Sequence, residues 1–400
     1  MLFAWILIGF AVFVVMYAYA LYPLLLKLTR SIRGRRPEPT THSGSWPQIS
    51  ITIPVYNEVS QIRDLLESIL RLDYPKERLQ VLVVSDASDD GTDEIVRSYA
   101  SKGIELLRMP VRGGKSAAEN AARSRLCGDI VVNTDASIRV DRNALKPLIA
   151  RFADPQVGLA SGRDVSVTKV DGELNVGEST YVGYEMWLRS VETELSGIVG
   201  ASGCFYAIRR ELHQHDLPAG LSRDFAAALV THERGYRAVS VNEAVCFVPR
   251  VPSLHSEYRR KVRTFTRGMQ TLYFKRHLLN PMRHGLFAWM LFSHKVARWF
   301  APWAAVLGLV GLIALAFSNP LARVGLAAAV LVLALAFIGW HWKEGKRPPR
   351  LFSMPAFLVA GNVAVLHATI NAMRGQINAV WEPTRRESRS EGHASTAAAR

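Results

Sequence analysis

Acidic and polar side chains follow two short apolar runs in the first third of the chain. Asp86, Asp89 and Asp90 come after one run, and Asp135 and Ser137 come after another. Carboxylate and hydroxyl oxygens are ligands for hard divalent cations, and a carboxylate can also take a proton from a reacting hydroxyl group. These residues are therefore candidates for an active site.

The runs that precede such residues have the composition of buried strands. They cover residues 49–54, 80–85 and 129–133, are rich in β-branched residues and end at turn-forming residues. Apolar residues recur at helical spacing between them, at 62–70 and 95–99. Alternating strands and helices predict a parallel α/β sheet, in which ligands bind beyond the carboxyl ends of the strands. The polar residues are expected to lie together there.

The composition limits the kinds of molecule that this chain is expected to bind. Four hundred residues allow one large domain or two small ones, together with membrane segments. The formal net charge of +15 comes from Lys and Arg that crowd beside apolar segments, without the aromatic interleaving of a nucleic-acid reader. This pattern favours anionic lipid at the cytoplasmic face and predicts no nucleic-acid partner. The three cysteines are scattered and suit neither a disulfide framework nor a zinc site.

The first apolar segment is long enough to cross a bilayer. No charged residue occurs between positions 2 and 26, and about 20 apolar residues suffice. No Lys or Arg precedes the segment, which favours a retained helix over a signal peptide. Lys27, Arg30 and Arg33 follow it, so the next part of the chain is expected in the cytoplasm.

Further membrane segments are predicted toward the C terminus. Residues 286–300 are apolar but carry two cations, so they are expected to be interfacial or to enter the membrane. Residues 301–317 and 324–340 have the length and composition of spans. Residues 351–370 are apolar enough to cross, but basic residues on both sides leave the crossing open.

Four motifs at the strand ends follow the order in which one enzyme family carries them. They are Pro54-Val55-Tyr56-Asn57-Glu58, Ser85 to Thr92, Gly113-Gly114-Lys115 with Asn120, and Thr134-Asp135-Ala136-Ser137. Together they resemble family-two glycosyltransferases of the GT-A fold, especially the membrane-integrated cellulose, chitin, hyaluronan and poly-N-acetylglucosamine synthases. The resemblance covers roughly residues 48–300. It implies a Rossmann-like α/β domain with a mostly parallel sheet, flanked by transmembrane and interfacial helices.

The resemblance assigns the first three motifs to the nucleotide-sugar donor. In the family, the residue that matches Asp86 hydrogen-bonds the nucleotide base, usually uracil, and residues that match Pro54, Tyr56 and Glu58 line the nucleotide pocket. Lys115 follows two glycines, so its cation could face the diphosphate. The structural alternatives are a turn or cap role for the aspartate and a solvated turn for the Gly-Gly-Lys stretch.

The resemblance also implies a metal site and a general base. Asp135 and Ser137 stand where the family carries its DxD motif, and are expected to hold Mg²⁺ or Mn²⁺ with serine in place of the second carboxylate. Ser222-Arg223-Asp224 stands where the family has Thr-Glu-Asp, so Asp224 is the expected base of an inverting transfer. A strand-end turn for Asp135 and a helix-cap role at Ser222 and Asp224 are the alternatives.

The remaining candidates for acceptor or diphosphate contacts are Gly203, Cys204, Arg223, Arg263 and Arg267. The first two lie where the family has a loop that touches the acceptor sugar. Arg223 replaces the motif acid, so it is expected to pair with phosphate or to act on the base. The last two lie in a basic, aromatic stretch, 254–279, that is expected to form a helix at the membrane surface. This stretch lacks the Gln and Trp of the QxxRW motif of processive members. The addition of one or a few sugars is therefore as compatible with it as the synthesis of a long polymer. A purely lipid-facing helix is the alternative.

The sequence thus predicts a multi-pass enzyme of the inner cell membrane with a cytoplasmic catalytic domain. Its expected partners are a nucleotide-sugar donor, UDP-linked by resemblance, a glycan or lipid-linked acceptor, the lipid bilayer and subunits of a polysaccharide export system. A polyprenyl-phosphate sugar transferase and a non-catalytic scaffold subunit are the alternatives. The expected divisions are an N-terminal transmembrane helix (1–28), a basic linker (29–48), a GT-A domain (49–253), basic interfacial helices (254–300), C-terminal transmembrane helices (301–371) and a basic, partly disordered tail (372–400).

Overall fold

The computed structural model describes most of the chain. It covers residues 1–34, 44–167, 176–214, 217–218, 220–249, 253–343 and 348–376. Residues 35–43 of the predicted linker and the predicted tail from residue 377 onward lie outside the described residues.

A single mixed sheet organises the chain between residues 49 and 249. Within the described residues its eight strands are β1 (Ile49–Val55), β2 (Leu79–Ser85), β3 (Ile104–Arg108), β4 (Ile130–Thr134), β5 (Arg139–Val140), β6 (Val157–Val167), β7 (Phe205–Arg209) and β8 (Arg237–Pro249). Their order is β3-β2-β1-β4-β7-β6-β8-β5. β7 runs antiparallel to both neighbours and β5 antiparallel to β8, whereas the other pairings are parallel. The predicted mostly parallel α/β sheet is confirmed.

The core explains why these runs form the centre of the sheet. Every residue of β1 is buried, and its isoleucines pack in one apolar cluster with the inward face of α3 (Ile62–Leu70). Close backbone packing adds to this at Gly128, just before β4. A Cβ built on Gly128 would lie 2.4 Å from the backbone nitrogen of Ser50, so only glycine lets the chain enter the sheet here.

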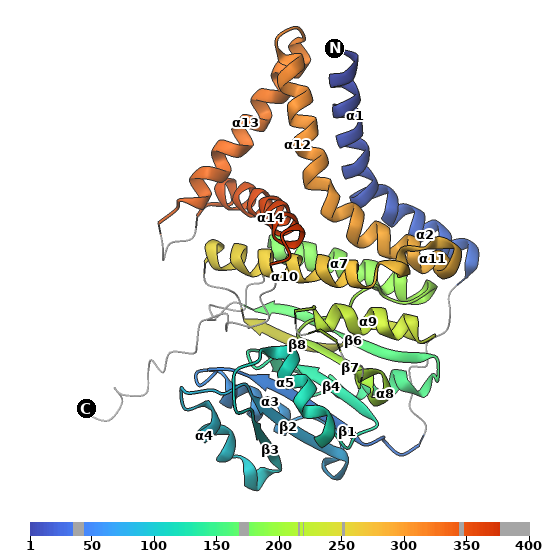
Figure 1. Ribbon diagram of the computed structural model, residues 1–400, viewed down its shortest axis with the longest axis vertical. Helices are drawn as coiled ribbons and strands as arrows, with labels where there is room; N and C mark the ends of the chain where they lie inside the picture. Colours follow the sequence, from blue (N-terminus) through green and yellow to red (C-terminus); the bar gives the residue numbers. More distant parts are fainter. Residues whose placement is uncertain are drawn as a thin grey trace, which may run out of the picture.

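Helices cover the sheet and carry parts of the site. They are α4 (Thr92–Arg97), α5 (Lys115–Ala122), α6 (Leu145–Ala150), α7 (Val176–Leu195), α8 (Arg210–His213), α9 (Arg223–Glu233) and α10 (Leu254–Phe274). In Figure 1, α7, α9 and α10 lie between the sheet and the long apolar helices. The predicted basic helix over 254–279 is α10, which ends at Phe274.

Four helices among the described residues are long and apolar enough to cross a membrane. They are Leu2–Arg33 (α1, Leu2–Met16, and α2, Tyr22–Arg33), Pro281–Ala316 (α11, Pro281–Leu291, and α12, Ala297–Ala316), Pro320–Trp340 (α13) and Arg350–Met373 (α14). Residues 29–33, expected in the linker, continue the first helix. The stretch 286–300, for which two arrangements were open, runs directly into α12 through a π-helical turn, Phe292–Val296.

The fourth apolar helix is oriented differently from the other three. α1, α12 and α13 project away from the sheet, whereas α14 lies at their base against α10 (Figure 1). The Lys261 ammonium lies 3.6 Å from the centroid of the Phe357 ring, and the Tyr258 hydroxyl lies 3.0 Å from Nδ1 of His367. The segment whose crossing the sequence left open therefore packs on the basic helix.

Small residues bring the N-terminal helix against α12. A Cβ built on Gly308 would lie 2.6 Å from Cβ of Ala11, and one on Gly311 would lie 2.7 Å from the carbonyl oxygen of Ala4. Such small residues allow two apolar helices to approach backbone to backbone. The first helix of the chain and a late one are thus paired directly.

Candidate active site

The glycine loop before α5 is bound by the aspartate that follows β2. Asp86 is buried, and its two carboxylate oxygens accept hydrogen bonds from the backbone N–H groups of Gly113 and Gly114, at 2.7 and 2.8 Å. The carboxylate therefore fixes the position of the chain just before Lys115. Each oxygen retains a second lone pair, so these bonds are compatible with the predicted contact to a nucleotide base.

The first motif packs directly against the second. The Asn57 side chain donates to Asp89 at 2.7 Å, and the Asp89 backbone N–H donates back to it at 3.0 Å. Tyr56 lies under the Arg112 guanidinium, 3.7 Å from the ring centroid. Glu58 is buried, and Pro54 is the buried residue before the last of β1. The predicted nucleotide-pocket residues thus meet at one edge of the sheet.

Lys115 joins the glycine loop to the predicted metal aspartate. Its ammonium lies 2.5 Å from Oδ1 of Asp135 and donates to the carbonyl oxygen of Gly203 at 3.3 Å. Burial alone would lower the pKa of Lys115, but the carboxylates of Asp135, Glu119 and Asp224 outweigh that effect and raise it. Lys115 therefore stays positively charged and lies among these three carboxylates.

Asp224 stands at the start of α9 beside the predicted acceptor loop. Oδ1 of Asp224 accepts a hydrogen bond from the Ser222 hydroxyl at 2.7 Å, and a Cβ built on Gly203 would lie 3.3 Å from Oδ2. Ser222 occupies the N-cap position but makes no side-chain cap bond. The alternative of a helix cap is therefore wrong for this hydroxyl, which donates to Asp224 instead.

Arg223 points away from Asp224 toward α5. Its Nε lies 3.0 Å from Oε2 of Glu119, and its guanidinium also donates to Oδ1 of Asn120 and to the carbonyl oxygen of His213. Both members of the ion pair are buried. The arginine expected at phosphate thus ties the helix that carries Asp224 to the helix that begins with Lys115. Nothing in the local sequence around Glu119 indicated this partner.

The predicted acceptor loop is held from below by a second residue that the sequence analysis did not find. Asp164 on β6 accepts a hydrogen bond from the Ser202 hydroxyl at 2.5 Å. The same hydroxyl oxygen accepts from the backbone N–H of Cys204 at 3.1 Å. Burial raises the pKa of Asp164. The carbonyl oxygen of Cys204 in turn accepts from the Asp135 backbone N–H, which links the loop to the end of β4.

Arg267, one of the two arginines predicted on α10, reaches the site. Arg267 donates to the carbonyl oxygen of Leu221 at 2.6 Å and lies 3.4 Å from the Ser116 hydroxyl, next to Lys115. Burial lowers the pKa of Arg267, while the charges of Asp224 and Glu119 oppose the shift. Arg263 lies one turn earlier on α10 and is partly buried.

Few side chains of the site are placed to bind a divalent cation. Asp135 is partly exposed at the end of β4, and Ser137 is buried two residues later. No cluster of three or more His, Cys, Asp or Glu side chains in the described part of the chain could hold a metal ion. Mg²⁺ is often bound by one or two carboxylates together with substrate phosphates. The residues therefore fit an ion shared with a bound diphosphate rather than one held by protein alone.

Comparison with known proteins identifies the domain that holds this site. The family model described as glycosyl transferase family 2 matches residues 50–217. These residues form a glycosyltransferase family 2 domain. Asp86, Lys115, Asp135 and the loop at Gly203 all lie within the matched range, while Asp224 lies just beyond it.

Two relatives of this chain are named for N-acetylglucosamine. An N-acetylglucosaminyltransferase of Mesorhizobium japonicum is 27% identical over 236 residues, which are 54% of this chain and 54% of the relative. A poly-beta-1,6-N-acetyl-D-glucosamine synthase of Staphylococcus aureus is 24% identical over 61% of this chain and 60% of its own. The chain thus spans little more than half the length of these relatives.

The fold extends beyond the glycosyltransferase domain. A mannosyltransferase, PcManGT from Pyrobaculum calidifontis, solved in complex with GDP-Man and Mn²⁺, has a TM-score of 0.69 and 24% identity to this chain. The similarity covers 92% of this chain and 99% of that one. The GT-A fold predicted from the sequence is confirmed, together with the apolar helices that flank it.

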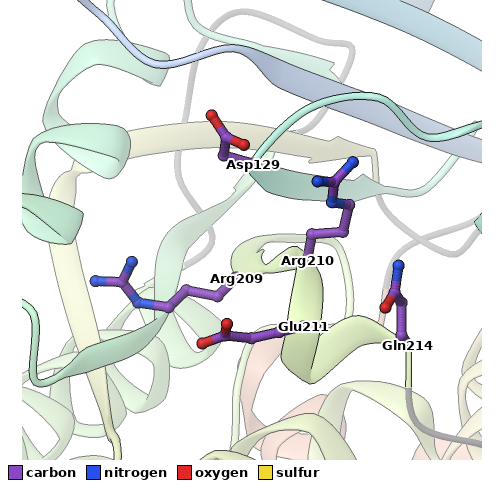
Figure 2. A pocket seen from close by; sticks show the side chains of 5 residues that line it. All are labelled: Asp129, Arg209, Arg210, Glu211 and Gln214. Carbon is purple, nitrogen blue, oxygen red and sulfur yellow. The ribbon is translucent and has the colours of Figure 1, made fainter.

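A separate pocket of the glycosyltransferase domain lies at the end of the sheet opposite the candidate active site. Figure 2 shows its five lining side chains, of which Asp129 precedes β4, whereas Asp135 follows that strand. Its volume is about 350 Å³. Arg209 donates to the carbonyl oxygen of Val157 at 2.8 Å, and Glu211 accepts from the Tyr236 hydroxyl at 2.8 Å. These polar groups serve the fold, so this pocket is not the candidate active site.

Proposed function

We propose that the chain is an inverting glycosyltransferase that moves a sugar from a nucleotide-sugar donor to a glycan or lipid-linked acceptor at the cytoplasmic membrane face. The observation that carries the proposal is the meeting of Lys115, Asp135 and Asp224 around Gly203, beyond the carboxyl ends of the strands. A diphosphate needs cations, and an acceptor hydroxyl needs a base on the opposite face of the sugar. This arrangement offers both within one small region.

The reaction assigns each group one task. Asp224 takes the proton of the acceptor hydroxyl, whose oxygen forms the new bond to the anomeric carbon while the bond to the diphosphate oxygen breaks. The nucleoside diphosphate leaves with the bonding electron pair. Lys115 then has to exchange part of its ion pair with Asp135 for the leaving phosphate, and Arg267 adds positive charge beside α5. The Ser222 hydroxyl holds the base toward the loop at Gly203.

Asp135, with Ser137 behind it, would hold Mg²⁺ or Mn²⁺ against the donor phosphates. When bound, the ion supplies Lewis-acid stabilisation of the leaving diphosphate. PcManGT is a GT-A neighbour in complex with Mn²⁺, which supports divalent-metal use without fixing the ion.

The membrane arrangement proposed here has three crossings, α1, α12 and α13. The three helices project on one side, and α14 lies along α10 on the side of the sheet (Figure 1). Lys27, Arg30 and Arg33 end the first apolar segment on that same side, as expected for the cytoplasmic face. Both ends of α14 then stay in the cytoplasm, as the basic residues on both sides of this helix would require.

Purified full-length protein provides the test. With a panel of UDP- and GDP-sugars, we expect one donor to be hydrolysed slowly in a Mn²⁺-stimulated reaction. Asp224→Asn should reduce transfer by about 10²–10⁴-fold, the usual contribution of a positioned base, with unchanged thermal unfolding. Asp129→Asn, at the opposite edge of the sheet, is the matched control. Donor binding without turnover by the native protein would favour the scaffold alternative, and an unaffected Asp224→Asn variant would refute the assigned base.

A further inference from the structure

A lysine interrupts the apolar helix that leads into the membrane. Lys295 lies in the π-helical turn Phe292–Val296, within the apolar stretch Pro281–Ala316. Phe292 and Phe300, on either side of it in the sequence, are 47% and 43% exposed, as lipid-facing side chains would be. A lysine in such a segment usually extends its ammonium toward water at the interface.

Lys295 instead points toward the acceptor loop. A Cβ built on Gly200 would lie 3.4 Å from Nζ of Lys295, and the same ammonium lies 5.5 Å from the centroid of the Phe225 ring. Phe225 directly follows Asp224 on α9. At the other end of the loop, Gly203 approaches Oδ2 of Asp224. The ammonium and the base therefore flank one short loop, 200–203.

The acidic side chains near Lys295 are engaged by other groups. Glu185 lies 2.8 Å from Nε2 of His294 and 2.9 Å from Arg298. Glu192 lies 2.6 Å from Nδ1 of the same histidine and accepts from the Tyr22 hydroxyl at 2.6 Å. Among the residues that the structure describes, no carboxylate lies within ion-pair distance of Lys295. Lys295 is half-buried, and a partly desolvated cation without an anion is costly, so an anionic ligand would be stabilised there.

We propose that Lys295 binds the phosphate of a lipid-linked acceptor whose terminal sugar hydroxyl reaches Asp224. The inference rests on the proposed transferase activity and narrows its acceptor to a phosphate-bearing membrane lipid. Loop 200–203 limits the distance between the two groups, since its ends are at most about 11 Å apart and each group lies close to one end. A phosphate and a short glycan bridge such a span. The lipid tail would then follow the helix that carries Lys295 into the bilayer.

Direct binding tests this site without knowledge of the natural acceptor. The full-length protein in phosphatidylcholine nanodiscs is titrated with geranylgeranyl phosphate and with geranylgeraniol, its uncharged match. We expect the native protein to bind the phosphate at least tenfold more tightly, Lys295→Met to lose that preference and Lys295→Arg to keep most of it. Lys27→Met, which removes the same charge from the exposed end of the first apolar helix, should keep it fully.

The lipid titration can overturn the proposal in two ways, and competition with inorganic phosphate can do so in a third. One is equal affinity of the native protein for phosphate and alcohol, which is independent of whether any variant folds. The other is an unchanged preference in a folded Lys295→Met or Lys295→Gln variant. Inorganic phosphate at the same concentration should not displace the lipid; displacement would assign the site to free phosphate and also refute a lipid acceptor.

Donor hydrolysis with water as the acceptor separates this inference from the proposed function. If the native protein hydrolyses a nucleotide sugar but shows no preference for the lipid phosphate, only the acceptor site is refuted. If no donor is hydrolysed, the transferase activity fails whatever the lipid titration shows.

Discussion

Replacement of Arg223 by methionine should destabilise the protein strongly, because it leaves a buried carboxylate without its counter-charge. Nε of Arg223 lies 3.0 Å from Glu119, and the two side chains are 5% and 1% exposed. Removal of one partner from a buried ion pair costs about 3–5 kcal/mol. For a domain of about 200 residues, each kcal/mol lowers Tm by about 2–4 °C, so the expected fall is about 6–20 °C.

The loss should depend on pH in a defined direction. Burial raises the pKa of Glu119, and the Arg223 guanidinium opposes that rise. Without the guanidinium the folded-state pKa climbs further above its unfolded value. A carboxyl group of this kind contributes stability that is complete below the unfolded pKa and is lost as the pH rises through the folded pKa. Arg223→Met should therefore lose more stability at pH 8 than at pH 5.

Thermal unfolding of the full-length protein in detergent at both pH values measures this effect. Arg97→Met is the matched control, since its ion pair with Glu94 is 53% and 70% exposed and exposed pairs contribute about 0–1 kcal/mol. Arg97 also lies 3.9 Å from the buried Asp93, which keeps Arg108 as its partner in this variant. The double variant Arg223→Met/Glu119→Gln should recover part of the loss, because no charge is left buried. Equal melting of the Arg223 and Arg97 variants, or a loss that does not change with pH, would refute the reasoning.

Two further substitutions test the cation at the centre of the site and the entry into β4. Lys115→Met frees Asp135 from a partly exposed ion pair. Without a nucleotide-sugar donor, Mn²⁺ should therefore bind this variant about fivefold more tightly, equivalent to about 1 kcal/mol, while turnover falls. Electron paramagnetic resonance of free Mn²⁺ measures the binding, and weaker binding would contradict the prediction. Gly128→Ala places a Cβ 2.4 Å from the backbone of Ser50 and should cost about 1–3 kcal/mol in thermal unfolding. Gly183→Ala, with nothing within 4 Å, is its control, and equal Tm values for the two would contradict the packing argument.

The centre of the sheet was predictable from sequence because burial dominates there. β1, β2 and β4 consist of β-branched runs that end in polar motifs, and each predicted run lies within one or two residues of the strand observed. β6 was not predicted. Only its first half is buried, and polar residues alternate irregularly beyond Ser161, where the strand continues past the core to pair with β8.

The site was predictable only where a motif belongs to one strand end. The sequence predicted Asp86, Lys115, Asp135 and Asp224 as functional residues, and the structure brings the last three together. It gave no sign that Glu119 is the partner of Arg223, because that pair depends on how α5 meets α9 in three dimensions. The direction of a side chain was not predictable either. The position of Ser222 before α9 fits a helix cap, but its hydroxyl donates to Asp224.

The contact between α1 and α12 sets an order for assembly during synthesis. Roughly 280 residues separate Met16, at the end of α1, from Ala297, at the start of α12. At about 5–20 residues per second the ribosome needs about 15–60 s to make that interval. On the proposed topology α1 spends this time alone in lipid, which its uncharged sequence tolerates, while the catalytic domain emerges and folds. Through Gly308 and Gly311, α12 then packs against a helix already in the membrane. The contact between α1 and α12 therefore forms only after the domain between them has been synthesised.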